Sequence, residues 1–392
     1  MPKIKSGQVL PFFYLLGLCL VPLLFSGESL RKGTVIKQFT AYSISESLSA
    51  NPLGIFETKL PCKPPMTWAE EPPVFHFLAG LTLRFLPGDL AQAAPLIAFF
   101  LLGIGIFALI SGQIHGFMSF VCVLSILFTP AYLRYSIQHI PDVLATSFLV
   151  LGAAALLRQK RGRTLLLFTL AITTKPVVIF AVAPLLFWKL IFKKKNPRFP
   201  DVLLWGTSLC ITAAPFLLWL VALKWTQIPN ALTVSHPLLS RLAARAGALL
   251  DYHYYLRFFT WVAVKGVGIP IFSFFVLGLL KVRRESRPSD LEQMLWFWVA
   301  GLVPFWLLVR EQNFVQDYYS LPFIAPVAIL GFVHAARAKR KWIFNGVFVA
   351  NLVIGLAGLA GMRPVGLAPG QSRPDFCGNP ALFPPEVKFE KR

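Results

Sequence analysis

The chain has 392 residues, of which 56% are apolar, 14% aromatic and only 14% charged. Apolar runs of about 20 residues recur along it, each long enough to cross the hydrocarbon core of a bilayer, so the composition argues against a soluble fold. A formal net charge of +21 would suit a nucleic-acid partner. The Lys and Arg residues, however, gather in short clusters between the apolar runs, as membrane topology requires. We therefore expect the membrane, and no nucleic acid, as a partner.

The pattern predicts an all-α fold, a polytopic transmembrane helix bundle of about 11 spans. In chain order the apolar runs are Pro11 to Phe25, Ala91 to Ser111, Phe117 to Leu133, Ile140 to Leu157, Thr164 to Thr174, Val177 to Ile191, Val202 to Leu223, Trp261 to Leu280, Leu295 to Val309, Tyr319 to Ala336 and Ile343 to Met362. Residues 1–362 would form one transmembrane domain, with a long first outer loop at 27–90 that carries short surface helices. Residues 363–392 would form a short non-cytoplasmic tail.

The basic clusters predict the orientation of the bundle. Lys3 and Lys5 precede the first run, which places the amino terminus in the cytoplasm. The first run also resembles a signal peptide, and we interpret it as an uncleaved anchor because more spans follow. Alternation then puts the later basic clusters, at 158–163, 189–198, 281–287 and 336–342, on the cytoplasmic side.

This orientation depends on one break in the chain. The stretch from Thr164 to Ile191 must form two spans that meet at Lys175-Pro176, because a single helix would put the three lysines at 193–195 outside.

Polar and ionisable side chains collect on the predicted outer face, which receives the segments 27–90, 130–141, 224–260 and 310–317 and the tail. An outward-facing active site follows. The sequence contains no zinc-binding, phosphate-loop or dinucleotide-binding pattern, so we assign no metal ligands and no cofactor with certainty. A requirement for a divalent cation stays open. Cys62 and Cys377 both fall on the outer side, where a disulfide between them is an open alternative to two free thiols.

Four stretches resemble, in this order, the polyprenyl-phosphate-sugar glycosyltransferases of GT-C fold, in the protein-mannosyltransferase-like and aminoarabinose-transferase-like group. They are EEPPVFHFLAGL at 70–81, YLRYSIQHIPDVLATSFLVLGAAALLR at 132–158, TLAITTKPVVIF at 169–180 and QNFVQDYYSLPFIAPVAIL at 312–330. The resemblance implies transfer of a hexosyl or pentosyl unit from a polyprenyl-phosphate-sugar donor to a lipid, glycan or protein acceptor on the periplasmic or lumenal face. The bacterial inner (cell) membrane is the expected location, and the endoplasmic reticulum would be topologically equivalent.

The chain departs from that family's pattern at three places. The family has an Asp just after its first span, where this chain has Glu28, with Glu46 the next acid. Glu71 stands where the aminoarabinose-transferase branch has a Lys. The chain also ends about 30 residues after its last predicted span, without the folded carboxy-terminal domain of longer relatives.

The chemistry needs one carboxylate and several cations. A phosphate leaving group is already an anion, so one carboxylate suffices to take the proton of the acceptor, whereas a glycosidase needs two. Arg or Lys side chains would stabilise the charge that develops on the phosphate. The catalytic candidates are Glu28, Glu70, Glu71 and Asp142. The candidates for binding the donor phosphate or substrate are Arg134, His139, Lys175, Arg257, Arg310, Tyr318 and Tyr319.

Each candidate also has a structural interpretation. Glu70 and Glu71 could be a solvated acid pair before an amphipathic surface helix at Val74 to Phe85. Asp142 could favour a helix amino terminus, and Lys175 could extend to the interface. The arginines and tyrosines could belong to an interfacial helix and an aromatic belt. At the level of the whole chain, the alternatives are a lipid-linked-glycan transporter or flippase, and a catalytically inactive GT-C-like membrane scaffold.

Overall fold

The computed structural model describes residues 35–60, 62–63, 66–67, 72–86, 93–112, 114, 117–194, 196–226, 228, 252–282, 288–308, 320–336, 341–360 and 388–389. The first predicted span and the candidates Glu28, Glu70, Glu71, Arg310, Tyr318 and Tyr319 lie outside these residues. Within them the fold is helical, with four strands of two residues each.

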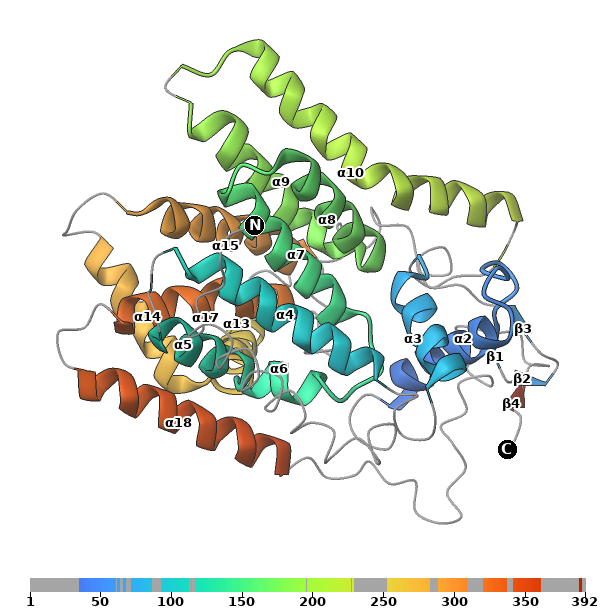
Figure 1. Ribbon diagram of the computed structural model, residues 1–392, viewed down its shortest axis with the longest axis horizontal. Coiled ribbons are helices and arrows are strands. Elements are labelled where there is room, and N and C mark those ends of the chain that lie inside the picture. Colours follow the sequence, from blue (N-terminus) through green and yellow to red (C-terminus); the bar gives the residue numbers. More distant parts are fainter. Residues whose placement is uncertain are drawn as a thin grey trace.

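The helices form one bundle with a smaller unit at one end (Figure 1). The smaller unit contains α2 (Val35–Ala50) and α3 (Val74–Phe85), with the strands β1 (Lys59–Leu60), β2 (Cys62–Lys63), β3 (Met66–Thr67) and β4 (Lys388–Phe389) beside it. The first half of the bundle contains α4 (Ala94–Ile110), α5 (Phe117–Leu127), α6 (Pro130–Tyr135), α7 (Asp142–Leu157), α8 (Arg161–Thr174), η4 (Pro176–Val178), α9 (Ile179–Phe187), the π-helical η5 (Trp188–Phe192) and α10 (Phe199–Thr226). The second half contains α13 (Tyr252–Thr260), the π-helical η7 (Trp261–Val267), α14 (Ile269–Val282), α15 (Asp290–Leu308), α17 (Leu321–Ala336) and α18 (Lys341–Ala360).

Every predicted apolar run from residue 91 onward coincides with described helices, but two of these runs are interrupted. The run 117–133 breaks before Pro130, which has no N–H to continue a helix. The run 261–280 breaks at Gly268, whose φ of +89° is incompatible with a helix. By length and composition one described helix, α10 with 28 residues, is sufficient to cross a membrane alone, and the other apolar helices are shorter. The number of spans therefore stays a prediction.

The predicted break at Lys175-Pro176 is present. Helix α8 ends at Thr174, Lys175 is extended with φ −150° and ψ 104°, and the chain resumes in η4 and α9. Because α7 and α8 pack along each other after a short turn, the end of α8 returns to the start of α7. At the opposite end of these helices, Lys193 contacts Asp290 at 2.6 Å and thereby joins η5 to α15.

The core lies between α4, α7, α8 and α17, and close helix contacts hold it together. Ser147 of α7 donates a hydrogen bond to the carbonyl oxygen of Ala98 in α4, at 2.6 Å. Gly331 of α17 lets the backbone of α14 approach, because a Cβ at this position would lie 2.5 Å from the oxygen of Ile271. Helix α10 extends along the outside of the bundle and exposes Leu203, Leu218 and Trp225 (Figure 1).

The carboxy-terminal strand β4 pairs with β2, with Cys62 opposite Phe389. Residues 388–389 therefore lie beside residues 62–63 of the predicted first outer loop. Cys377 lies outside the described residues, so whether it forms a disulfide with Cys62 stays open.

Candidate functional site

A buried ion pair lies where α7 begins and α8 ends. Lys175 Nζ is 3.7 Å from Asp142 Oδ1, and the two side chains are only 3% and 2% exposed. Asp142 is the first residue of α7. Its negative charge also stabilises this helix, because it lies at the positive end of the helix macrodipole. Lys175 can reach it because Pro176 prevents α8 from continuing. Two residues that are 33 positions apart in the sequence, both singled out as candidates, are thus in contact.

Three polar side chains meet between α2, α3 and the segment before α7, and we call them the Ser45 cluster: Ser45, His76 and His139. Ser45 Oγ is 3.0 Å from His139 Nε2 and 3.5 Å from His76 Nδ1, and all three residues are buried. The Ser45 hydroxyl donates its single proton to the oxygen of Ala41 at 2.8 Å. Its two lone pairs are left to accept, so both histidines donate to it.

Two aromatic rings enclose the imidazole of His139. Phe75 and Tyr42 contact it edge to face, with ring centroids at 5.0 and 5.6 Å. This burial, and then the nearby His76, lowers the pKa of His139 from 6.5 to about 3. His139 is therefore neutral at physiological pH. Its imidazole faces the α2–α3 unit and carries no positive charge. This geometry therefore does not support the direct contact with phosphate that the sequence suggested for His139.

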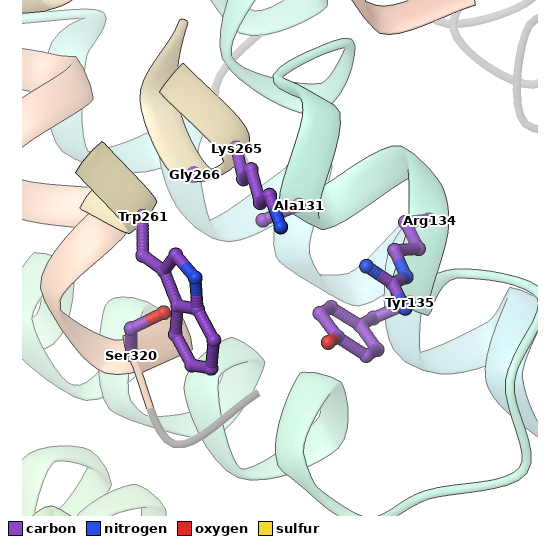
Figure 2. A pocket seen from close by; sticks show the side chains of 7 residues that line it. All are labelled: Ala131, Arg134, Tyr135, Trp261, Lys265, Gly266 and Ser320. Atoms are coloured by element: carbon purple, nitrogen blue, oxygen red, sulfur yellow. The ribbon is translucent and has the colours of Figure 1, made fainter. Parts of the chain in front are cut away.

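A small open pocket lies between α6 and η7, and two cationic side chains are part of its lining. Its lining is Ala131, Arg134, Tyr135, Trp261, Lys265, Gly266 and Ser320. Figure 2 shows the side chain of Lys265 extending toward Ala131 between Trp261 and Tyr135, and the guanidinium of Arg134 beside the ring of Tyr135. The guanidinium of Arg134 lies 5.4 Å from the ring of Tyr135, and the ammonium of Lys265 lies 5.8 Å from the ring of Trp261. Two cations held by aromatic rings in an open pocket suit an anion such as phosphate.

The segment 130–142 joins these features, because it carries Arg134 into the pocket, His139 into the Ser45 cluster and Asp142 into the ion pair. Ser320, which precedes α17 and follows Tyr318-Tyr319 directly, also lines the pocket. Arg257 lies on α13, just before η7, and its side chain is outside the described residues. The structure therefore brings Arg134, His139, Asp142 and Lys175 to one region. The remaining candidates stay predictions.

Ser45, His76 and Lys265 are not among the candidates predicted from the sequence. Lys265 had a usable signal, because it is a charged residue inside an apolar run that was predicted to span the membrane. Ser45 and His76 had none, since each becomes notable only through a contact with a residue far away in the sequence. Among the residues that the structure describes, no three His, Cys, Asp or Glu side chains lie close enough together to hold a metal ion.

The sequence matches no protein-family model and no curated protein. Among solved structures, the fold is similar to that of ArnT from Cupriavidus metallidurans, both in the apo state and bound to undecaprenyl phosphate. The apo structure has a TM-score of 0.61 at 15% identity and covers 89% of this chain and 62% of ArnT. The bound structure has a TM-score of 0.61 at 15% identity and covers 91% of this chain and 65% of ArnT.

A looser likeness, with a TM-score of 0.49 at 12% identity, is to the Archaeoglobus fulgidus oligosaccharyltransferase in complex with Zn and sulfate, covering 91% of this chain and 52% of that one. The similarity to ArnT confirms the GT-C fold that the four sequence stretches implied. This chain spans less than two thirds of the length of ArnT, at 62% and 65% in the two structures.

Proposed function

We propose that this chain is an integral-membrane glycosyltransferase that moves a sugar from a polyprenyl-phosphate donor to an acceptor on the outer face. The observation that carries the proposal is the cationic pocket of Arg134 and Lys265, which is joined to the buried Asp142–Lys175 pair through the single segment 130–142. The fold supports it, because ArnT shares this fold and one of its structures is bound to undecaprenyl phosphate. The exposed apolar face of α10 suits a lipid surrounding.

In this proposal the pocket holds the donor phosphate. Arg134 would bind two phosphate oxygens through its planar guanidinium group, and Lys265 would add a second positive charge. Both charges stabilise the phosphate as it leaves the anomeric carbon, so no acid is needed to protonate it. Lys265 would thus supply a positive charge in place of the Lys that the aminoarabinose-transferase branch has where this chain has Glu71.

A carboxylate then removes the proton of the acceptor hydroxyl or amine as this group attacks. Lys175 already engages Asp142, so we assign this pair to orienting the site, and we keep Glu28, Glu70 and Glu71 as candidates for the base. Residues 72–86 begin directly after Glu71, and α3 within them packs on α2, α4 and α8. The residues that follow Glu71 therefore enter a helix that packs on α8, the helix that ends just before Lys175.

The transporter alternative would need charged groups along a path across the bilayer. The charged contacts described above lie at helix ends, which favours chemistry at one surface over transport. The inactive-scaffold alternative is left to experiment. The turnover assay also tests the acceptor and the choice between a hexosyl and a pentosyl unit. The bacterial inner membrane and the cytoplasmic amino terminus stay predictions, and labelling from each side of the membrane tests the orientation.

The test is a turnover assay on membranes with radiolabelled polyprenyl-phosphate sugars, with donor binding measured separately. One of three variants, Glu28→Gln, Glu70→Gln or Glu71→Gln, should remove the base. That variant should lower turnover by about 10²-fold or more while the donor still binds. Glu57→Gln is the matched control, because Glu57 is an exposed carboxylate of the same predicted loop. Full activity in all three variants would contradict a carboxylate base on this loop. A wild-type protein without turnover on any donor would favour the scaffold.

A further inference from the structure

We infer that the Ser45 cluster is a positioning device that fixes the α2–α3 unit against the start of α7. This inference rests on the proposed function for its catalytic consequence, but the contact itself can be tested without any activity. His139 lies three residues before Asp142, so a bond from α2 to His139 reaches the immediate neighbourhood of the ion pair. Ser45 and His139 are therefore positioning residues, and neither need touch the substrate.

The two helices of the α2–α3 unit pack closely on each other. Gly80 of α3 allows the two helices to approach so closely that a Cβ there would lie 3.0 Å from the oxygen of Ser45 and 3.1 Å from the nitrogen of Ser49. His76, from α3, contacts the same hydroxyl as His139. One hydroxyl thus connects both helices of the unit to the bundle.

The unit carries the segments that hold the candidate bases. His76 follows Glu71 by five residues, and α2 follows the segment that contains Glu28. Moving the unit relative to α7 would therefore change where these carboxylates lie with respect to Asp142 and Lys175. A displacement of about 1 Å can lower a rate by about 10²-fold without any loss of a reacting group.

The variants are chosen to separate the hydrogen bonds from the packing. Ser45→Ala removes the shared hydroxyl, and His139→Leu removes the donor from the bundle. His139→Gln keeps an N–H that can donate to Ser45 Oγ, and it serves as the conservative variant. Ser49→Ala is the matched control on the same helix, because its hydroxyl donates only within α2, to the oxygen of Glu46 at 2.7 Å.

The first measurement is the distance between spin labels at Leu53, just after α2, and Leu166, on α8, with the native cysteines replaced by serine. Both positions are exposed, by 91% and 60%. We expect the distance distribution to broaden or shift in Ser45→Ala and His139→Leu and to stay narrow in Ser49→Ala. His139→Gln should lie closer to the wild type than His139→Leu does.

The second measurement is the split between kcat and KM for the donor in the same variants. We expect Ser45→Ala and His139→Leu to lower kcat by about tenfold or more with a KM change of less than about threefold, because the donor pocket of Arg134 and Lys265 is untouched. A narrow, unshifted distance in Ser45→Ala would overturn the inference, whatever the rate. His139→Gln behaving like His139→Leu would also overturn it. A wild type without turnover would remove the proposed function, while the spin-label distances would still decide on the positioning contact.

Discussion

Asp142 and Lys175 place two opposite charges where neither side chain reaches water. Removing one partner of a buried pair leaves the other charge uncompensated, which costs about 3–5 kcal/mol. We expect Asp142→Asn and Lys175→Gln each to destabilise the protein by this amount in detergent. The double variant should be more stable than the sum predicts by about 1–3 kcal/mol, because no charge is then left unpaired.

The exposed pair of Lys193 and Asp290 is the matched control for this cycle. Its atoms are closer, at 2.6 Å, but its side chains are 31% and 55% exposed. Exposed pairs contribute about 0–1 kcal/mol, so Lys193→Gln and Asp290→Asn should each have little effect on unfolding. Equal coupling energies for the two pairs would show that burial does not govern the Asp142–Lys175 contact.

His139 should make the stability of the protein depend on pH. Its pKa is about 3 in the folded chain and has its ordinary value of 6.5 in the unfolded chain. Between these two values the unfolded state binds one proton more, so stability is fully present above pH 6.5 and falls by about 1.4 kcal/mol per pH unit as the solution becomes more acidic. Thermal unfolding between pH 7.5 and 5 should therefore show a steeper loss in the wild type than in His139→Gln. Parallel curves would contradict the buried, neutral imidazole.

At the scale of elements, the sequence predicted helices best where backbone chemistry delimits them. Pro72-Pro73 precede α3, whose bounds agree with the prediction at Val74 and Phe85, and Pro176 marks the end of α8. Helix α2 was not predicted individually, although its buried apolar positions Ala41, Ile44 and Leu48 have the i, i+3, i+7 spacing of a helix. Polar residues are also buried in this helix, among them Ser45, whose contacts with His76 and His139 come from distant parts of the sequence and leave no local signal.

Gly268 sets the boundary between η7 and α14, and we expect it to resist substitution. Its φ of +89° is unfavourable for other residues, and a Cβ there would lie 2.4 Å from Asn351 Oδ1. Asn351 is buried and donates to the oxygen of Ser125 at 2.8 Å, so it cannot move without losing that bond. Gly268→Ala should lower the free energy of unfolding by about 1–3 kcal/mol.

Gly162→Ala is the control for this substitution, because a Cβ at Gly162 meets nothing within 4 Å. In a helix the added methyl group should be neutral or stabilising by up to about 1 kcal/mol. Since η7 carries Lys265, Gly268→Ala should also weaken donor binding. An unchanged melting temperature in Gly268→Ala would argue against the break between η7 and α14.

At the scale of the whole molecule, the contacts at helix ends agree with the predicted outer and cytoplasmic sides of the membrane. Residues predicted to be outside contact one another, as Lys175 does with Asp142 and Ser45 with His139. Residues predicted to be cytoplasmic do the same, as Lys193 does with Asp290 and Arg158 with Ser111. The fold alone does not say which side is which, because this depends on the charge distribution and not on packing.

Cysteine labelling from each side of the membrane decides the orientation. Leu53 is a suitable position in the predicted outer loop because it is 91% exposed, whereas Ser45 in the same loop is fully buried and could not be labelled from either side. In a background without native cysteines, Leu53→Cys should react with an impermeant reagent only from outside. Arg161→Cys and Lys194→Cys, both at exposed positions, should react only from the cytoplasm.

The three labels distinguish two ways in which the predicted membrane topology could be wrong. If all three react from the opposite side, the whole bundle is inverted and the proposed site faces the cytoplasm, which would contradict an outer acceptor. If position 194 alone reacts from outside, α8 and α9 together cross the membrane once, and the carboxy-terminal half is inverted relative to the first. The second outcome would show that the break at Lys175-Pro176, where α8 ends and the chain resumes in η4 and α9, is not a boundary between two spans. Because the basic clusters at 158–163 and 189–198 are predicted to lie on one side, we expect positions 161 and 194 to be labelled together.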